Sequence, residues 1–353
     1  MLFCKPQVEL SEEQKKLRRW VKEIQLLQHY GLKIGLNYCI FDFDVEYLGK
    51  IYKIHTFSGG QNNKVCHILM QEILILLHGY GGSNLHYSRI YGELIEKFKV
   101  YSLDLPGMGY SSKSDIKMDS CEEAMDFFMG TISKLVMGLC PNLQVTLIGH
   151  SFGGFIAAHL LVRFPKLFKR LILLSPAGTT YYTEEQIIQK QDFSQLSFLR
   201  RKMIEYAKGL WEGVFAIPQY LNDRFIGRQF IKIYLKHRMR LSGIEYTLWK
   251  SYIDEMLELP EGSEKSICLF FHFPIFAKGQ NSIESILSMN GNQIKNIPIS
   301  FYFGNSDWMD FRGAMNLNFN QNIRLRIIPD AGHQLNFENP QGVVQAIVQE
   351  IFQ

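Results

Sequence analysis

The chain has little net charge, few cysteines and no long apolar run, and each shortage excludes a class of protein. Charged residues make up 20% of its 353 positions and hydrophobic residues 46%, a balance typical of globular proteins and not of disordered or fibrous chains. A net charge of +4 is too small over this length to predict nucleic-acid binding. The longest apolar candidate for a membrane span, Ile267 to Ala277, falls short of the roughly 18 to 20 residues required and is interrupted by His272 and Pro274. We therefore expect a folded protein that is soluble or peripheral to a membrane.

The 6 cysteines lie far apart and include no CxxC pair, so the sequence predicts neither a zinc site nor a disulfide framework. Free thiols in a reducing compartment are expected, and no metal or cofactor. The amino-terminal segment lacks the apolar run of a signal peptide, and Glu9, Glu12 and Glu13 are unlike an acid-poor mitochondrial transit peptide. The expected location is cytoplasmic, peripheral to membranes or lipid droplets, with a mitochondrial location as the alternative.

Short β-rich apolar runs alternate with helix-compatible stretches along most of the chain, which predicts an α/β fold with a largely parallel sheet. An amphipathic helix precedes them, because Ser11 and Gln14 form a capping-box pattern, and a last helix is expected over 341–352 after Pro340. The expected strands cover residues 51–57, 65–70, 73–77, 100–103, 145–148, 171–174, 297–303 and 323–328.

The strand rhythm disappears between residues 179 and 292, where helical segments over 199–215 and 224–241 are rich in aromatic and basic residues. This segment resembles an insertion. We therefore expect a lead-in with the amphipathic helix (1–45), a first core part (46–178), a helical cap (179–292) and a second core part (293–353).

Residues Gly149 to Gly153 match the G-x-S-x-G nucleophile elbow, with Ser151 at its centre. The motif follows an apolar strand and precedes a helix-like stretch over 155–162, which is the setting that the elbow requires. The nucleophile of an elbow lies on a strained turn, so the flanking positions, here Gly149 and Gly153, must lack side chains. Ser151 is the predicted nucleophile.

An elbow also needs an acid and a base, in the chain order Ser, Asp or Glu, His. Asp307 lies just beyond the expected strand at 297–303, and His333 lies in the loop after the last expected strand. We predict Asp307 as the acid and His333 as the base. Asp310, three residues further along the same loop, is the alternative acid.

The tetrahedral oxyanion needs two backbone N–H donors, one of them from the residue after the nucleophile, here Phe152. The second is expected from Tyr80, in an HGxGG loop that follows the strand at 73–77. The remaining residues expected to shape the site are His78, Gly79, Gly81, Gly82 and His150.

With the turn Asp104 to Ser111, the elbow and the HGxGG loop resemble the α/β-hydrolase superfamily over about residues 50 to 353. The leading helix with Trp20, the run Gly304 to Asp310 and the triplet Ala331 to His333 are similar to the α/β-hydrolase-domain 4/5 group. That group includes a lysophospholipase acting on N-acyl phosphatidylethanolamines, a lipid-droplet coactivator of triglyceride lipase, lysophosphatidate acyltransferases and mitochondrial cardiolipin deacylases. The resemblance implies a mostly parallel eight-stranded sheet flanked by helices, an inserted helical cap, and a lipid acyl ester as substrate.

Some members of that group carry asparagine in place of the elbow serine and are not hydrolases, whereas this chain has Ser151. The acyltransferase activity in the group is associated with a His followed five positions later by Asp, and here His333 is followed by Glu338. The leading hypothesis is therefore a serine hydrolase (a carboxylic ester hydrolase) that deacylates a phospholipid or lysophospholipid. The alternatives are a lysophosphatidate acyltransferase and a non-catalytic, structural partner in a lipid or membrane complex.

Charge is concentrated in residues 199–240, which hold ten Lys or Arg against three acidic residues and leave −3 for the rest of the chain. Basic helices with aromatic faces suit the surface of an anionic membrane or a lipid droplet. The alternative is a cap whose charges are only solvated. The amino-terminal helix, with five basic residues around Trp20, is a second candidate membrane contact or else docks on the hydrolase core.

Overall fold

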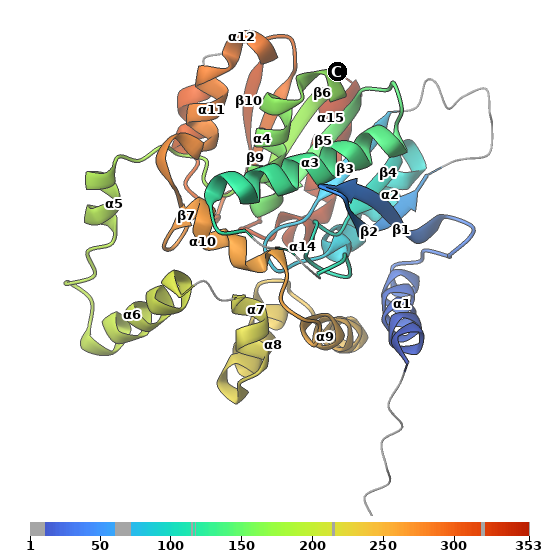
Figure 1. The fold of residues 1–353 in the computed structure, drawn as a ribbon, viewed down its shortest axis with the longest axis horizontal. Helices are drawn as coiled ribbons and strands as arrows, with labels where there is room; N and C mark the ends of the chain where they lie inside the picture. Colours follow the sequence, from blue (N-terminus) through green and yellow to red (C-terminus); the bar gives the residue numbers. More distant parts are fainter. Residues whose placement is uncertain are drawn as a thin grey trace, which may run out of the picture.

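A computed structural model describes residues 11–60, 72–113, 116, 118–213, 216–318 and 322–352 (Figure 1). This part contains an eight-stranded sheet in the order β1-β2-β4-β3-β5-β6-β9-β10. β2 pairs antiparallel with β1 and β4, and the other neighbours are parallel, so the predicted fold class is confirmed. The strands are β1 (Tyr38–Tyr47), β2 (Lys50–Gly59), β3 (Ile73–Leu77), β4 (Lys99–Leu103), β5 (Val145–His150), β6 (Phe168–Leu174), β9 (Ile299–Gly304) and β10 (Ile323–Ile328).

Seven of these strands match expected runs, and the expected strand at 65–70 lies outside the described residues. β3 and β5 are buried along their whole length because helices cover both faces of the sheet. β1 was not predicted. Only Tyr38, Ile40 and Val45 are buried, and polar residues interrupt the apolar ones.

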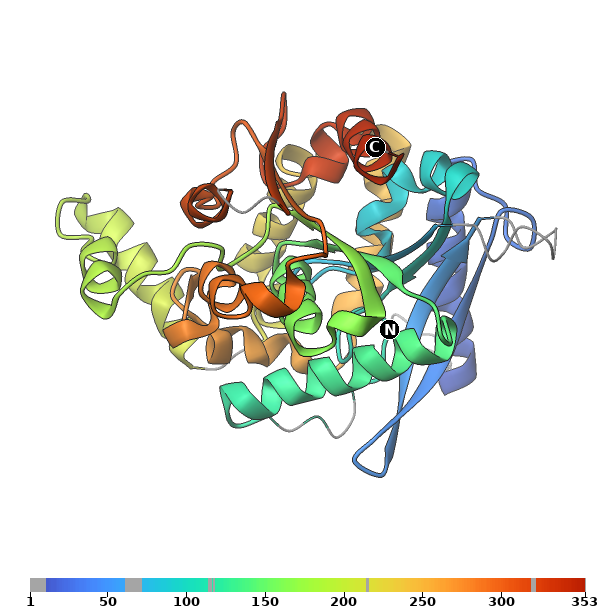
Figure 2. The ribbon, with the colours of Figure 1, turned by 90° about the horizontal axis from the view of Figure 1, so that it is seen from above.

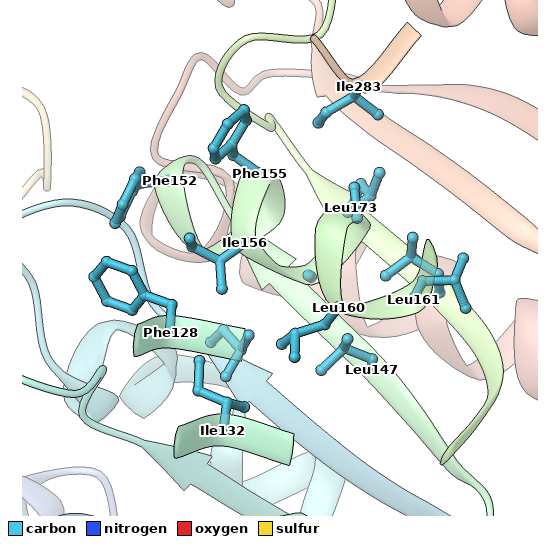
Figure 3. Packing of buried hydrophobic residues seen from close by; sticks show 14 of the residues in the cluster. Phe128, Ile132, Leu147, Phe152, Phe155, Ile156, Leu160, Leu161, Leu173 and Ile283 are labelled. Carbon is cyan, nitrogen blue, oxygen red and sulfur yellow. The ribbon is translucent and has the colours of Figure 1, made fainter. Parts of the chain in front are cut away.

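Helices pack on both faces of the sheet (Figures 1 and 2). Figure 3 shows how α4 is held: Leu160 lies beside Leu147 of β5, and Ile156 lies near Phe128 of α3. This packing fixes the helix that begins directly after Ser151. The helices outside the cap are α1 (Glu12–His29), α2 (Ser88–Lys97), α3 (Cys121–Leu139), α4 (Phe152–Arg163), α11 (Ile283–Met289), α12 (Gly291–Ile294), α13 (Arg312–Leu317), α14 (Leu335–Glu338) and α15 (Pro340–Phe352), with 3₁₀ turns η2 (Asn84–Tyr87), η3 (Pro165–Leu167) and η5 (Gly279–Asn281).

The segment between β6 and α11 is helical apart from a two-stranded ribbon, and α6 to α9 lie below the sheet in Figure 1. The helices expected over 199–215 and 224–241 are α6 and α8, and residues 214–215 lie outside the described part. α11 lies within the expected cap range 179–292 but packs against α4, and we call the segment from α5 to α10 the cap. Its elements are α5 (Glu184–Lys190), α6 (Phe198–Glu212), α7 (Ile217–Asn222), α8 (Phe225–His237), α9 (Gly243–Leu257), η4 (Ser263–Ser266), α10 (Ile267–Phe270), β7 (Phe271–His272) and β8 (Phe276–Ala277).

α1 begins with the predicted capping box, in which Ser11 and Gln14 exchange side-chain-to-backbone hydrogen bonds. The helix packs against α9 of the cap, where Arg18 and Lys22 form ion pairs with Glu255 at 2.5 and 2.8 Å. Lys16 is paired with Asp42 of β1 at 2.5 Å. These contacts favour docking on the protein as the role of α1. Among the described residues, none of the helices combines the length and apolarity that crossing a bilayer requires.

Candidate active site

Ser151 lies in the sharp turn between β5 and α4, with φ 53° and ψ −117°, a conformation that is strained for a residue with a side chain. The turn is possible because its flanking positions lack side chains. A Cβ at Gly149 would lie 2.4 Å from the Gly153 carbonyl oxygen, and one at Gly153 would lie 2.3 Å from the His78 carbonyl oxygen. The close approach of strand, helix and HGxGG loop therefore requires glycine at both positions.

The structure brings the three predicted side chains together from three separate loops. The Oγ atom of Ser151 lies 3.1 Å from Nε2 of His333, and Nδ1 of His333 lies 3.4 Å from Oδ1 of Asp307. The Asp307 side chain is almost wholly buried and accepts a 3.0 Å hydrogen bond from the Met309 N–H. Burial raises the pKa of Asp307, but the neighbouring His333 imidazole and the Met309 amide outweigh it and hold that pKa below its ordinary value. Asp307 is thus ionised beside the imidazole.

The alternative acid, Asp310, faces elsewhere. Its carboxylate forms an ion pair with Arg312 at 2.7 Å and accepts a hydrogen bond from the Tyr182 hydroxyl. Arg312 lowers the pKa of Asp310 below its usual value against the raising effect of partial burial. The geometry therefore assigns Asp307, and not Asp310, to His333.

The HGxGG loop after β3 is held by the buried ring of His78. Its Nε2 accepts a 2.8 Å hydrogen bond from the Leu105 N–H, so Nδ1 carries the proton and donates to the Gly79 carbonyl at 2.7 Å. Burial lowers the pKa of His78 to about 4, which keeps the ring neutral. The backbone amides of Tyr80 and Phe152 donate no hydrogen bond to any described residue, and both are thus free to bind an oxyanion.

Two contacts fix the loop that carries His333. Nε2 of His150 donates a 2.8 Å hydrogen bond to the His333 carbonyl, and burial lowers the pKa of His150 to about 3. On the other side, Oε2 of Glu338 accepts a 2.6 Å hydrogen bond from the Gly332 N–H. The imidazole of His333 is therefore positioned through its own backbone as well as by Asp307.

A cavity of about 600 Å³ opens over Ser151 and His333. Its walls are mainly apolar side chains of the cap, including Phe230 and Ile233 of α8 and Trp249 of α9. A volume of this size is within the range of small-molecule sites, and an apolar lining favours a hydrocarbon ligand.

Many residues that line this cavity were not assigned to it from the sequence, among them His86 and Trp308. The ring of His86 stacks on that of His150, with centroids 4.1 Å apart, and lines the cavity. Trp308 also lines the cavity, with its ring centroid 5.1 Å from that of His333. The position of Trp308 directly after Asp307 was a usable signal, whereas nothing local marked His86. Within the described ranges, no group of three or more His, Cys, Asp or Glu side chains is arranged to hold a metal ion.

Residues 72–340 match the family model described as alpha/beta hydrolase fold. A probable 1-acylglycerol-3-phosphate O-acyltransferase of Oryza sativa subsp. japonica is 27% identical over 289 residues, which are 78% of this chain and 66% of that protein. The 1-acylglycerol-3-phosphate O-acyltransferase ABHD5 of Homo sapiens is 36% identical over 105 residues, 30% of each chain. The chain thus spans about two thirds of the first relative and less of the second.

Solved structures agree on the fold. The carboxylesterase CesB of Bacillus subtilis superimposes with a TM-score of 0.63 and 18% identity, over 96% of this chain and 98% of that one. The family model covers the elbow, the HGxGG loop and the loops of Asp307 and His333. The chain belongs to the α/β-hydrolase family, and within it is similar to the α/β-hydrolase-domain 4/5 group.

Proposed function

We propose that the chain is a serine hydrolase that deacylates a phospholipid or lysophospholipid through an acyl-enzyme. The observation that carries the proposal is the continuous chain of close contacts from Ser151 through His333 to Asp307, at the base of an apolar cavity. A reactive serine at the end of a hydrocarbon-lined chamber fits an ester whose acyl chain occupies the chamber.

In this mechanism, Oγ of Ser151 attacks the ester carbonyl carbon while Nε2 of His333 takes the hydroxyl proton. Asp307 holds the imidazole in the required tautomer and stabilises the imidazolium. The negative oxygen of the tetrahedral intermediate accepts hydrogen bonds from the amides of Tyr80 and Phe152, each worth about 2.7 to 4 kcal/mol in comparable enzymes. The intermediate collapses as His333 protonates the leaving alcohol, and water then cleaves the acyl-enzyme by the same route.

A phosphate-bearing lipid is favoured over a neutral one by the charge near the entrance. Arg238 lines the cavity at the end of α8, within the segment whose net charge is +7. Glu338 also lines the cavity, but its carboxylate already accepts a hydrogen bond from the Gly332 N–H. Arg238 therefore supplies a cation to a mainly apolar chamber, which matches an amphipathic ester with an anionic head group.

The experiment compares hydrolysis of defined phospholipids and lysophospholipids by the wild type with that by Ser151→Ala, Asp307→Asn and Asp310→Asn. Ser151→Ala should abolish the release of fatty acid, and Asp307→Asn should lower kcat by about 10⁴-fold, as the loss of the correct His tautomer does in serine proteases. Asp310→Asn is the matched control from the same loop and should retain most activity. Equal losses for Asp307→Asn and Asp310→Asn, or full activity in Ser151→Ala, would contradict the proposal.

Acyl transfer to lysophosphatidate is the second candidate, because relatives bear that name and Glu338 follows His333 by five positions. Glu338 already accepts a hydrogen bond from the Gly332 N–H, which gives it a role in holding the loop. Product analysis with acyl-CoA and lysophosphatidate both present separates the two: hydrolysis releases fatty acid, and transfer forms phosphatidate. A protein that produces neither in a lipid screen would instead support the non-catalytic alternative.

A further inference from the structure

Helix α8 carries a stripe of apolar side chains that face solvent. Ile226, Phe230 and Ile233 follow one another at helical spacing of four and three residues, and they are 70%, 51% and 55% exposed. Exposed apolar side chains that are scattered singly need no explanation, but a contiguous stripe on one helix indicates a binding surface.

A second stripe on the same helix is basic. Arg228, Lys232 and Lys236 are spaced by four residues, and α8 contains no acidic residue. None of the three forms an ion pair with an acidic side chain of the described chain. The cations of α1 differ in this respect, because Lys16, Arg18 and Lys22 are already paired with buried or half-buried carboxylates. Three basic residues without an acidic partner thus lie on α8, against Arg19 on the amino-terminal helix.

Helix α6 extends this surface. It lies on the same side of the molecule as α8, below the sheet in Figure 1, and a 2.7 Å hydrogen bond between the Tyr206 and Tyr220 hydroxyls joins it to α7. We call the exposed faces of α6 and α8 the cap surface. Its large exposed apolar side chains are Phe198, Leu199, Met203, Tyr206, Phe225, Ile226, Phe230, Ile233 and Tyr234.

The cap surface is continuous with the cavity. Phe230 and Ile233 belong to the exposed stripe and also line the chamber above Ser151. We propose that the cap surface docks on an anionic phospholipid bilayer, with the apolar stripe of α8 inserted among the acyl chains and Arg228, Lys232 and Lys236 against lipid phosphates. Docked in this way, the protein takes an acyl chain from the membrane into the cavity along Phe230 and Ile233, without passage through water.

An anionic bilayer fits this surface because it offers acyl chains to the apolar stripe of α8 and phosphates to its basic stripe. An interfacial helix buries its apolar side about 5 to 10 Å into the boundary between head groups and acyl chains, while flanking Lys and Arg contact phosphates. The inference goes beyond the proposed hydrolysis, because it concerns binding and not bond cleavage. It predicts that Ser151→Ala binds vesicles as the wild type does, so failure of one claim is distinguishable from failure of the other.

The test is flotation of the full chain with vesicles of phosphatidylcholine alone or with about 30% phosphatidylserine. Each basic side chain near an anionic surface contributes roughly a fivefold gain in affinity, so Arg228→Gln, Lys232→Gln and Lys236→Gln together should weaken binding roughly 100-fold. Binding should also weaken as salt increases, because Arg228 and Lys236 are exposed and Lys232 is half-buried, so ions screen their charges. Phe225→Asp with Ile226→Asp, which leaves the cavity lining untouched, should abolish binding at low salt.

The matched control is Leu48→Asp with Ile51→Asp, two exposed apolar positions at the β1–β2 turn, which should bind as the wild type does. Unchanged thermal unfolding and circular dichroism of each variant exclude misfolding as the cause. Equal binding to both vesicle types, or an equal loss in the Leu48 and Ile51 control, would overturn the proposal. Capture of an acidic protein by the cap surface with no binding to vesicles would overturn it as well.

Discussion

Glu23 of α1 forms one half of a buried ion pair, and its removal should destabilise the protein strongly. Nε2 of His55 lies 2.7 Å from Oε2 of Glu23, Nδ1 lies 2.9 Å from Oδ1 of Asp42, and both His55 and Glu23 are fully buried. Oε1 of Glu23 also accepts a hydrogen bond from Asn84, just after the HGxGG loop. Burial lowers the pKa of His55, but the two carboxylates outweigh it and raise that pKa well above its ordinary value. The imidazole is therefore a cation held between two anions.

Glu23→Gln keeps the shape of the side chain and its bond from Asn84 but removes the negative charge beside His55. Breaking a buried ion pair by removing one partner costs about 3 to 5 kcal/mol, because a charge is left buried without that partner. Asp42 still faces Nδ1 of His55 in this variant, so the expected loss lies at the lower end of that range. Nothing screens this pair, since both partners lie away from solvent. Glu12→Gln on the same helix removes the partner of Lys15 at an exposed position, and no measurable change in the free energy of unfolding is expected there.

Urea unfolding followed by fluorescence measures the free energy of unfolding of each variant and hence the difference between Glu23→Gln and Glu12→Gln.

The pH dependence of stability is a second test of the His55 ion pair. Because the folded pKa of His55 is raised, its stabilisation is complete below about pH 6.5 and decreases as pH rises toward the folded pKa. The stability gap between the wild type and His55→Gln should therefore shrink on going to alkaline pH. If Glu23→Gln lowers the free energy of unfolding no more than Glu12→Gln does, the contacts of His55 with Glu23 and Asp42 do not stabilise the packing of α1.

Three further expectations follow from the site. Gly153→Ala should unfold or inactivate the protein, because the new Cβ would lie 2.3 Å from the His78 carbonyl oxygen. Gly209→Ala in α6 is the control: a Cβ there meets open space, so thermal stability should stay the same or increase. Burial lowers the folded-state pKa of His78 to about 4 and that of His150 to about 3. The stability that the two neutral rings confer is therefore present above pH 6.5 and decreases as the pH falls toward those values. A series of thermal unfolding measurements from pH 7 to pH 4 that shows no decrease attributable to either histidine would refute this. Glu338→Ala leaves the Gly332 N–H unsatisfied and should cost about 1 to 3 kcal/mol by urea unfolding, whereas Glu338→Gln, which still offers an acceptor, should cost less.

The sequence indicated most of the parallel sheet and the elbow because both are written in local patterns. Apolar runs such as that of β3 mark strands that are covered on both faces, and the spacing of Gly149, Ser151 and Gly153 reflects a steric requirement of one turn. β1 was missed because its alternating polar residues do not form an apolar run. The meeting of Asp307 and His333 was also readable, since each follows a strand that ends at the same edge of the sheet.

Features set by tertiary packing were not readable. His55 and Glu23 are 32 positions apart, and nothing in either local segment shows that they meet in the core. The same holds for His86, which reaches the cavity because η2 places it on the ring of His150. The choice between Asp307 and Asp310 needed side-chain positions, since Arg312 and Tyr182 contact Asp310 and His333 contacts Asp307. Local sequence patterns thus indicate which residues are candidates for the site, and contacts between distant segments determine which candidates lie beside Ser151.

The central claim is that Ser151 is an activated nucleophile, and labelling with a fluorophosphonate tests it most directly. Intact mass spectrometry of the wild type should show a single adduct, and peptide mapping should place it on Ser151. Ser151→Ala should remain unlabelled, and Asp307→Asn should label far more slowly than the wild type. An unlabelled wild type, or an adduct that persists in Ser151→Ala, would contradict the assignment of the active site.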